Sequence, residues 1–176
     1  AWYNKERALA YEHSPYDTTI LMDCDYFVFS STLLELANTK FDMMLHDSVK
    51  DLTGQNMIEG KDESTLPLVW ATVTLFRKTE KTRQIFELIR HVQEYYTHYK
   101  NLYRIRYENY RNDYAFAIAL HQLNLGNRIP TPMSMLADSV DVLDSDSDGI
   151  IFKHSNKVNF TSGLDVHIMD KEWCNG

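Results

Sequence analysis

SPYDTTILMDCDYFVF, residues 14–29, is the stretch from which the fold is best predicted. Residues 17–22 predict a buried strand, and two aspartates, Asp23 and Asp25, follow at once. Because side chains in a strand alternate between its two faces, we expect both carboxylates on one side, with Cys24 facing the core. The alternative is a strand-to-turn junction that carries two exposed acids.

The two aspartates indicate a metal site. Carboxylates that lie close together repel each other, and burial removes their hydration. A divalent cation offsets both the repulsion and the lost hydration, and oxygen ligands suit Mg²⁺ or Mn²⁺. Ligands of open α/β sheets also bind at the carboxyl ends of the strands, which is where this pair lies. The sequence therefore predicts that Asp23 and Asp25 hold Mn²⁺ or Mg²⁺.

The rest of the chain reads as strands and helices in alternation. Its patterns predict a mixed α/β fold in which helices follow strands. The residues after 133 change to short strands and turns. We expect helices over 3–12, 32–38, 79–100 and from 112 or 113 to 123, strands over 41–46 and 68–76, and a polar loop over 50–65.

Composition narrows the class of protein. The chain has 176 residues, of which 44% are hydrophobic, enough for one domain over residues 1–176 with a real core. Its net charge of -7 argues mildly against a nucleic-acid partner. Two distant cysteines do not form a disulfide framework. With no apolar run of membrane-spanning length and no visible signal peptide, we expect no membrane partner and a cytoplasmic location.

The same stretch resembles the metal-binding motif of the GT-A fold glycosyltransferases, the nucleotide-diphospho-sugar transferases. SPYDTTILMDCD matches the central strand of that family, and its two acids match the residues that bind Mn²⁺ or Mg²⁺ on the donor diphosphate. The resemblance implies a Rossmann-like mixed sheet flanked by helices. It also implies transfer of a sugar from a nucleotide-diphospho-sugar donor. The acceptor stays open between a glycan, a protein, a small molecule and a modified base.

The resemblance extends to further residues. It implies that Lys5 neutralises a donor phosphate and that Asp113, in RNDYAFAIAL, is the acid near the donor sugar; as an alternative, Asn112 or Asp113 caps its helix. Trp70 and Arg111 would position donor sugar or acceptor.

DVHIMDK, residues 165–171, offers the third metal ligand of the family, His167, and the diphosphate-binding Lys171. His154 is the competing third ligand.

One part of the family pattern has no counterpart. The first strands, which hold the nucleotide base, would precede the helix at residue 3. The resemblance therefore implies a fold that is truncated or reduced at the N-terminus, with residues 1–176 as the C-terminal part of a larger domain, or a second chain that supplies that half.

Two other functions fit part of the pattern. A haloacid-dehalogenase-type phosphohydrolase also begins with a strand ending in Asp-x-Asp, with Asp23 as nucleophile and Thr72 or Thr74 in its second motif. A non-catalytic partial transferase would act as a binding module.

DSDSDGIIFKHS, residues 144–155, resembles a calcium-binding loop but lacks the glutamate at position twelve. We therefore interpret it as a β-turn between two strands.

Overall fold

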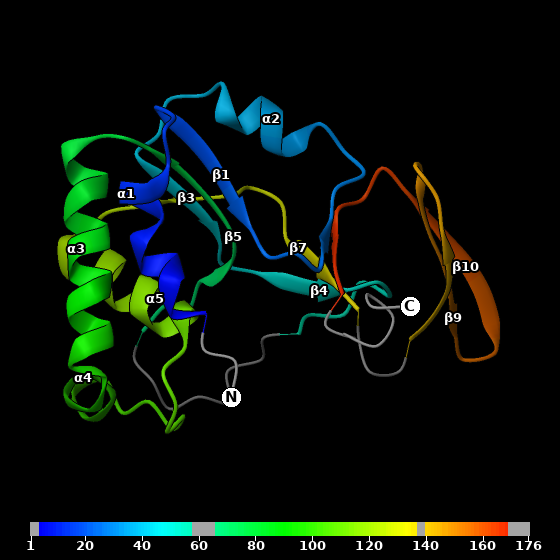
Figure 1. The fold of residues 1–176 in the computed structure, drawn as a ribbon. Coiled ribbons are helices and arrows are strands. Elements are labelled where there is room, and N and C mark those ends of the chain that lie inside the picture. The colour runs from blue at the N-terminus through cyan, green and yellow to red at the C-terminus, as the bar shows by residue number, and fades with distance from the viewer. Residues whose placement is uncertain (1–3, 58–65, 137–139, 169–176) are drawn as a thin grey trace.

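The computed structural model describes residues 4–57, 66–136 and 140–168. The chain has a mixed α/β fold, as the sequence predicts, with three sheets among the described residues (Figure 1).

The first sheet positions the predicted site. Its strand order is β1–β5–β3–β6, with bounds Thr18–Met22, Trp70–Arg77, Met43–His46 and Asn127–Arg128. β5 runs antiparallel to both β1 and β3, whereas β6 runs parallel to β3. β1, β3 and β6 therefore share one direction, and their carboxyl ends meet at the same edge of the sheet.

Helices cover one face of this sheet (Figure 1). They are the 3-10 helix η1 (Lys5–Leu9) and the α-helices α1 (Ala10–His13), α3 (Glu80–Glu94), α4 (Tyr96–Leu102) and α5 (Asn112–Leu123). The core beneath them is aromatic. The ring of Phe86 lies edge-on to Phe76 and to Phe116, with centroids 5.0 Å and 5.8 Å apart. Such pairs add to the free energy of burial. Helix α5 is buried from Tyr114 to Leu120, which fixes it against the sheet.

The other face of the first sheet carries helix α2, Thr32–Ala37, and a second apolar cluster that includes Leu33, Val73, Leu75 and Met133. A second sheet adjoins this cluster. Its strand order is β2–β11–β7–β4, with bounds Tyr26–Phe27, Val166–His167, Met133–Met135 and Val49–Asp51. The short strand β2 follows β1 after three residues, so the segment between them joins the two sheets.

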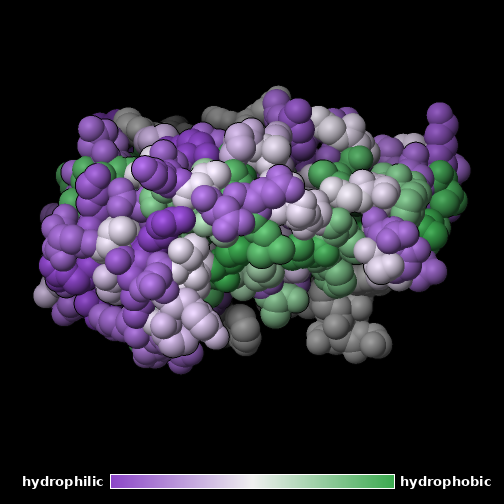
Figure 2. All heavy atoms as spheres, turned by 90° about the horizontal axis from the view of Figure 1, so that it is seen from above, coloured by the Kyte–Doolittle hydropathy of each residue, from purple (hydrophilic) through white to green (hydrophobic). Residues whose placement is uncertain are grey.

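The third sheet is an antiparallel arrangement of β8, β9 and β10, with bounds Asp141–Ser145, Gly149–His154 and Lys157–Ser162. The β-turn interpretation of residues 144–155 is confirmed, because Asp146 Oδ1 accepts hydrogen bonds from the backbone N–H groups of Asp148 and Gly149 at 2.8 and 3.1 Å. Val158 and Phe160 of β10 are more than half exposed. Seen from above, apolar surface lies at this end of the molecule and in the middle of the same face (Figure 2).

Three expected elements differ from the structure. In place of the one helix expected over 3–12, the described residues form η1 at Lys5–Leu9 and α1 at Ala10–His13. The helix expected over 79–100 breaks at Tyr95, whose φ and ψ of -109° and 34° are not helical, while the apolar period continues into α4. The loop expected over 50–65 is preceded by β4, which pairs with β7, and residues 58–65 lie outside the described residues. Periodicity reports which face is buried, and it does not report such breaks.

No helix in the described part of the chain has both the length and the apolar character needed to cross a membrane.

Candidate metal centre

The two aspartates lie in the turn that joins β1 to β2. The N–H of Asp23 donates to Thr72 O at 3.0 Å, and the N–H of Tyr26 donates to Asp23 O at 3.2 Å, which closes the turn. Strand alternation therefore does not bring the carboxylates together, as the sequence led us to expect. The turn does so, and it leaves Cys24 exposed at its tip, so the prediction that Cys24 faces the core is wrong.

A third side chain reaches this turn from the far end of the chain. β11 pairs antiparallel with β2, with His167 opposite Tyr26, and the N–H of Ile168 donates to Asp25 O at 2.9 Å. This pairing sets His167 Nε2 3.2 Å from Asp25 Oδ1. One ligand atom from each of Asp23, Asp25 and His167 lies within 4.8 Å of the other two. His154, the competing third ligand, is not in this cluster.

Part of the cluster is buried without hydrogen-bond partners among the described residues. The side chain of His167 is 8% exposed and that of Asp25 is 16% exposed. Asp25 Oδ1 and His167 Nδ1 are buried, and neither has a hydrogen-bond partner among the described residues. A buried polar atom without a partner costs about 1–3 kcal/mol, a cost that a ligand bound here would offset.

The donor set fits a divalent cation. The 3.2 Å approach between Asp25 Oδ1 and His167 Nε2 lacks hydrogen-bond alignment. Two neighbouring ligands of an octahedral ion with bonds of about 2.1 Å lie roughly 3 Å apart, close to this separation. Carboxylates suit Mg²⁺, Ca²⁺ and Mn²⁺, and imidazole suits Zn²⁺ and Fe²⁺, so this donor set fits several divalent ions.

Arg7 is the cation that the structure places at the cluster. Its side chain, 3% exposed, donates hydrogen bonds to Asp23 Oδ1 and to Ala71 O. Asn4 adds a long contact to the same carboxylate oxygen at 3.5 Å. Burial raises the pKa of Asp23 above its ordinary value and Asp25 adds to this rise, whereas Arg7 and His167 oppose it. Arg7 therefore opposes the effect of burial and favours the charged form of Asp23.

Asp113 connects to this cluster through the backbone of one residue, Ala71. Its Oδ1 accepts from Ala71 N at 2.9 Å, while Ala71 O accepts from Arg7. Its Oδ2 accepts from Arg111 Nη2 at 3.0 Å. The helix cap expected at Asn112 or Asp113 is wrong: Arg111 precedes the first turn of α5, and no side chain caps that end. Asp113 instead ties α5 to β5.

The other predicted site residues are distributed as follows. Lys5 is exposed in η1, and its backbone oxygen accepts from Gln93 Nε2 at 3.3 Å. Trp70 opens β5 and packs, half-buried, against the second apolar cluster. Arg111 lies over the ring of Tyr107, 5.1 Å from its centroid. Lys171 lies outside the described residues.

Sequence reasoning chose Lys5 and missed Arg7. Both are basic residues of one short helical turn, and either one fits a pattern that asks only for a cation before the strand. What distinguishes Arg7 from Lys5 is that Arg7 lies on the buried side of η1. Arg7 is followed directly by Ala8, and the pair forms the buried part of η1. The guanidinium also offers several donors in fixed directions, which suits an acceptor on each side.

Compared with protein-family models, with curated proteins and with solved structures, the chain gives no match.

Proposed function

We propose that this protein is a metal-dependent glycosyltransferase that acts on a nucleotide-diphospho-sugar. The observation that carries the proposal is the meeting of Asp23, Asp25 and His167 within 4.8 Å, at the carboxyl end of β1. This triad combines the acid pair of the sequence motif with a histidine more than 140 residues later. The GT-A-like arrangement of the fold is part of the same proposal.

The proposed site consists of three metal ligands and the residues that hold them in place. Asp23, Asp25 and His167 would hold Mn²⁺ or Mg²⁺. When bound, such an ion neutralises charge that develops on a departing diphosphate. Arg7 orients Asp23 by its hydrogen bond and favours the ionised form of that carboxylate. Asp25 and His167 are held by the pairing of β2 with β11, so their positions do not depend on the ion.

The remaining residues of the proposal surround the donor. Arg111 and Asp113 form an ion pair at the start of α5, and Asp113 is linked to Arg7 through Ala71. This pair would orient the donor sugar or the acceptor. Trp70, which opens the strand that also contains Ala71, would offer an apolar face for a sugar ring.

Two lysines complete the proposed donor site. Lys5 and Lys171 would contribute positive charge toward the donor phosphates. For Lys171 this role rests on the sequence alone.

Donor turnover tests the proposal. The chain is incubated with Mn²⁺ and a panel of nucleotide-sugars, and release of nucleoside diphosphate is measured. We expect release from one donor, and its loss in Asp25→Asn, because the amide cannot supply the ligand charge. Asp146→Asn, in the turn between β8 and β9, is the matched control and should keep full activity. Activity that survives in Asp25→Asn contradicts the proposal, and release of phosphate from a simple phosphoester would instead indicate a hydrolase.

A further inference from the structure

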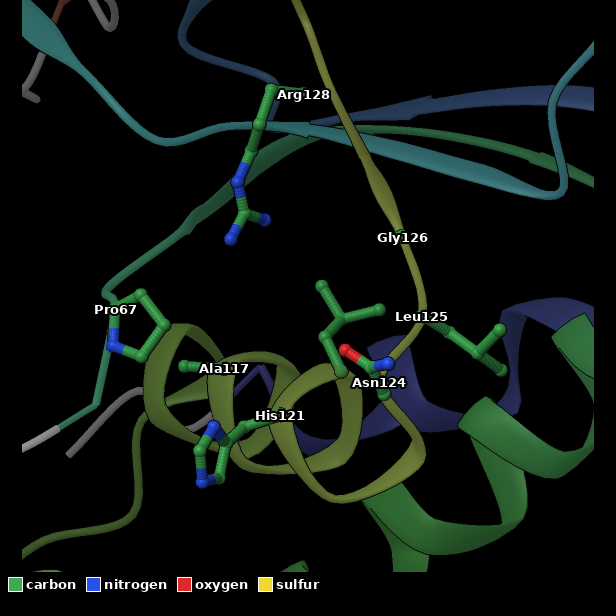
Figure 3. A pocket seen from close by; sticks show the side chains of 8 residues that line it. Pro67, Ala117, His121, Asn124, Leu125, Gly126 and Arg128 are labelled. Atoms are coloured by element: carbon green, nitrogen blue, oxygen red, sulfur yellow. The ribbon is translucent and has the colours of Figure 1, made fainter.

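A cavity of about 240 Å³ lies beside β6, at the edge of the first sheet opposite to β1 (Figure 3). Its walls come from the carboxyl-terminal half of α5, from the chain that leaves this helix, and from Pro67 ahead of β5. The volume is that of roughly eight water molecules, and it is below the usual range for drug-sized ligands. The cavity therefore suits a compact ligand.

The backbone around the cavity has a fixed shape. Asn124 ends α5 in the left-handed conformation, with φ of 50°. Gly126 follows with φ of 94°, and a Cβ atom there would lie 2.8 Å from Leu120 Cδ2. The chain thus passes close over α5 before it rises into β6. Glycine is favoured at this position by its positive φ, so the backbone sets the shape of this wall of the cavity.

The described lining contains one charged side chain, that of Arg128, which pairs with Asp47 outside the lining. Arg128, His121 and Asn124 supply its polar side chains, and no carboxylate is among the described residues that line it. Figure 3 shows the guanidinium of Arg128 extending from β6 toward α5, over the space bounded by Pro67 and Asn124. In a chain of net charge -7, a cavity with this lining favours a negative ligand.

The guanidinium of Arg128 has hydrogen-bonding capacity left over. Its Nε lies 3.1 Å from Asp47 Oδ2, which holds the group in place. Its Nη1 has no hydrogen-bond partner in the described part of the chain and is itself buried, so a ligand would meet the more exposed atoms of the group. The side chain of Arg128 is 35% exposed, so part of the group remains accessible. Guanidinium groups bind carboxylates and phosphates through two parallel hydrogen bonds.

We propose that this cavity is a binding site for a compact oxyanion, a carboxylate or phosphate group, with Arg128 as its main ligand and His121 and Asn124 as further donors. The site is separate from the metal centre. β1 and β6 are the two edge strands of the sheet, and three strand spacings amount to roughly 14 Å. One compact ion cannot contact both. The inference therefore does not depend on the proposed transferase activity.

Titration of the whole chain, in metal-chelating buffer, tests the site. Inorganic phosphate and malonate are added separately, and the backbone amide signals of Asn124, Gly126 and Arg128 are followed by NMR. We expect saturable shifts with a millimolar dissociation constant for at least one anion. The two titrations distinguish a phosphate site from a carboxylate site. Absence of saturable shifts with both anions overturns the proposal.

Two variants test whether Arg128 binds the anion or only stabilises the fold through its ion pair with Asp47. Arg128→Gln should weaken anion binding by about 10-fold or more, as expected for loss of a charged hydrogen bond. Asp47→Asn removes the same ion pair but leaves Arg128 with one competing acid fewer, so binding should be retained or strengthened. Thermal melts of both variants establish that they fold. Equal weakening in the two folded variants, or unchanged binding in Arg128→Gln, overturns the proposal.

Discussion

Replacement of Arg7 by methionine should both destabilise the protein and increase its response to Mn²⁺. Met fills much of the same volume without a charge. The change removes a charged donor from the buried Ala71 O, which then keeps the Thr74 hydroxyl at 3.3 Å. A hydrogen bond from a charged group contributes about 1.5–3 kcal/mol. The lost pair with Asp23, whose side chain is 29% exposed, adds about 1 kcal/mol.

The total loss for Arg7→Met is therefore about 3 kcal/mol, which corresponds to a fall in Tm of roughly 6–12 °C for a chain of this size. Mn²⁺ should restore more stability to the variant than to the wild type, because the ion then replaces the only cation hydrogen-bonded to Asp23 among the described residues. Circular dichroism melts with and without Mn²⁺ measure both effects.

Arg83→Met is the matched control for Arg7→Met. Arg83 is a surface arginine of α3 that pairs with Glu80 and Glu87, so its loss should leave the Tm nearly unchanged. A fall in stability below about 1 kcal/mol in Arg7→Met, or equal stabilisation by Mn²⁺ in both proteins, refutes the reasoning.

Three further predictions concern the supports of the site and the fold. Asp113→Ala should cost about 1–3 kcal/mol by leaving Ala71 N without an acceptor, whereas Asp113→Asn should cost less; urea unfolding measures both, and equal losses would contradict this view. Gly149→Ala should cost about 3 kcal/mol, because its Cβ would lie 1.6 Å from Thr161 O, and hydrogen exchange should rise across β9 and β10. Burial lowers the pKa of His46, so the unfolded state binds more protons than the folded state. The free energy of unfolding should therefore fall as pH drops below about 6.5. A His46→Gln variant whose free energy of unfolding falls with the same slope would contradict this.

The sequence predicted the fold best where local pattern and burial agree. The strand at Thr18–Met22 and the helix at Thr32–Ala37 match their expected ranges closely, because apolar spacing and the flanking turn residues indicate the same boundaries. The break at Tyr95 was not predictable, since the aromatic residues on both sides continue the helical period.

The candidate site was predicted in its residues more than in its geometry. The motif pointed to Asp23 and Asp25, but a turn and not a strand joins their carboxylates. The resemblance favoured His167 and left His154 as a competitor, and the pairing of β11 with β2 places His167 in the cluster. Long-range pairing of this kind leaves no local signal. The cavity beside Arg128 likewise depends on how the chain after α5 packs, which no short pattern encodes.

Calorimetric titration with Mn²⁺ tests the central claim most directly. We expect wild-type protein to bind one ion per chain, more tightly in the presence of one nucleoside diphosphate. Asp25→Asn and His167→Gln should each lose at least about tenfold in affinity, while Asp146→Asn should match the wild type. Absence of binding to the wild type, or equal binding by all four proteins, would contradict a metal centre at Asp23, Asp25 and His167.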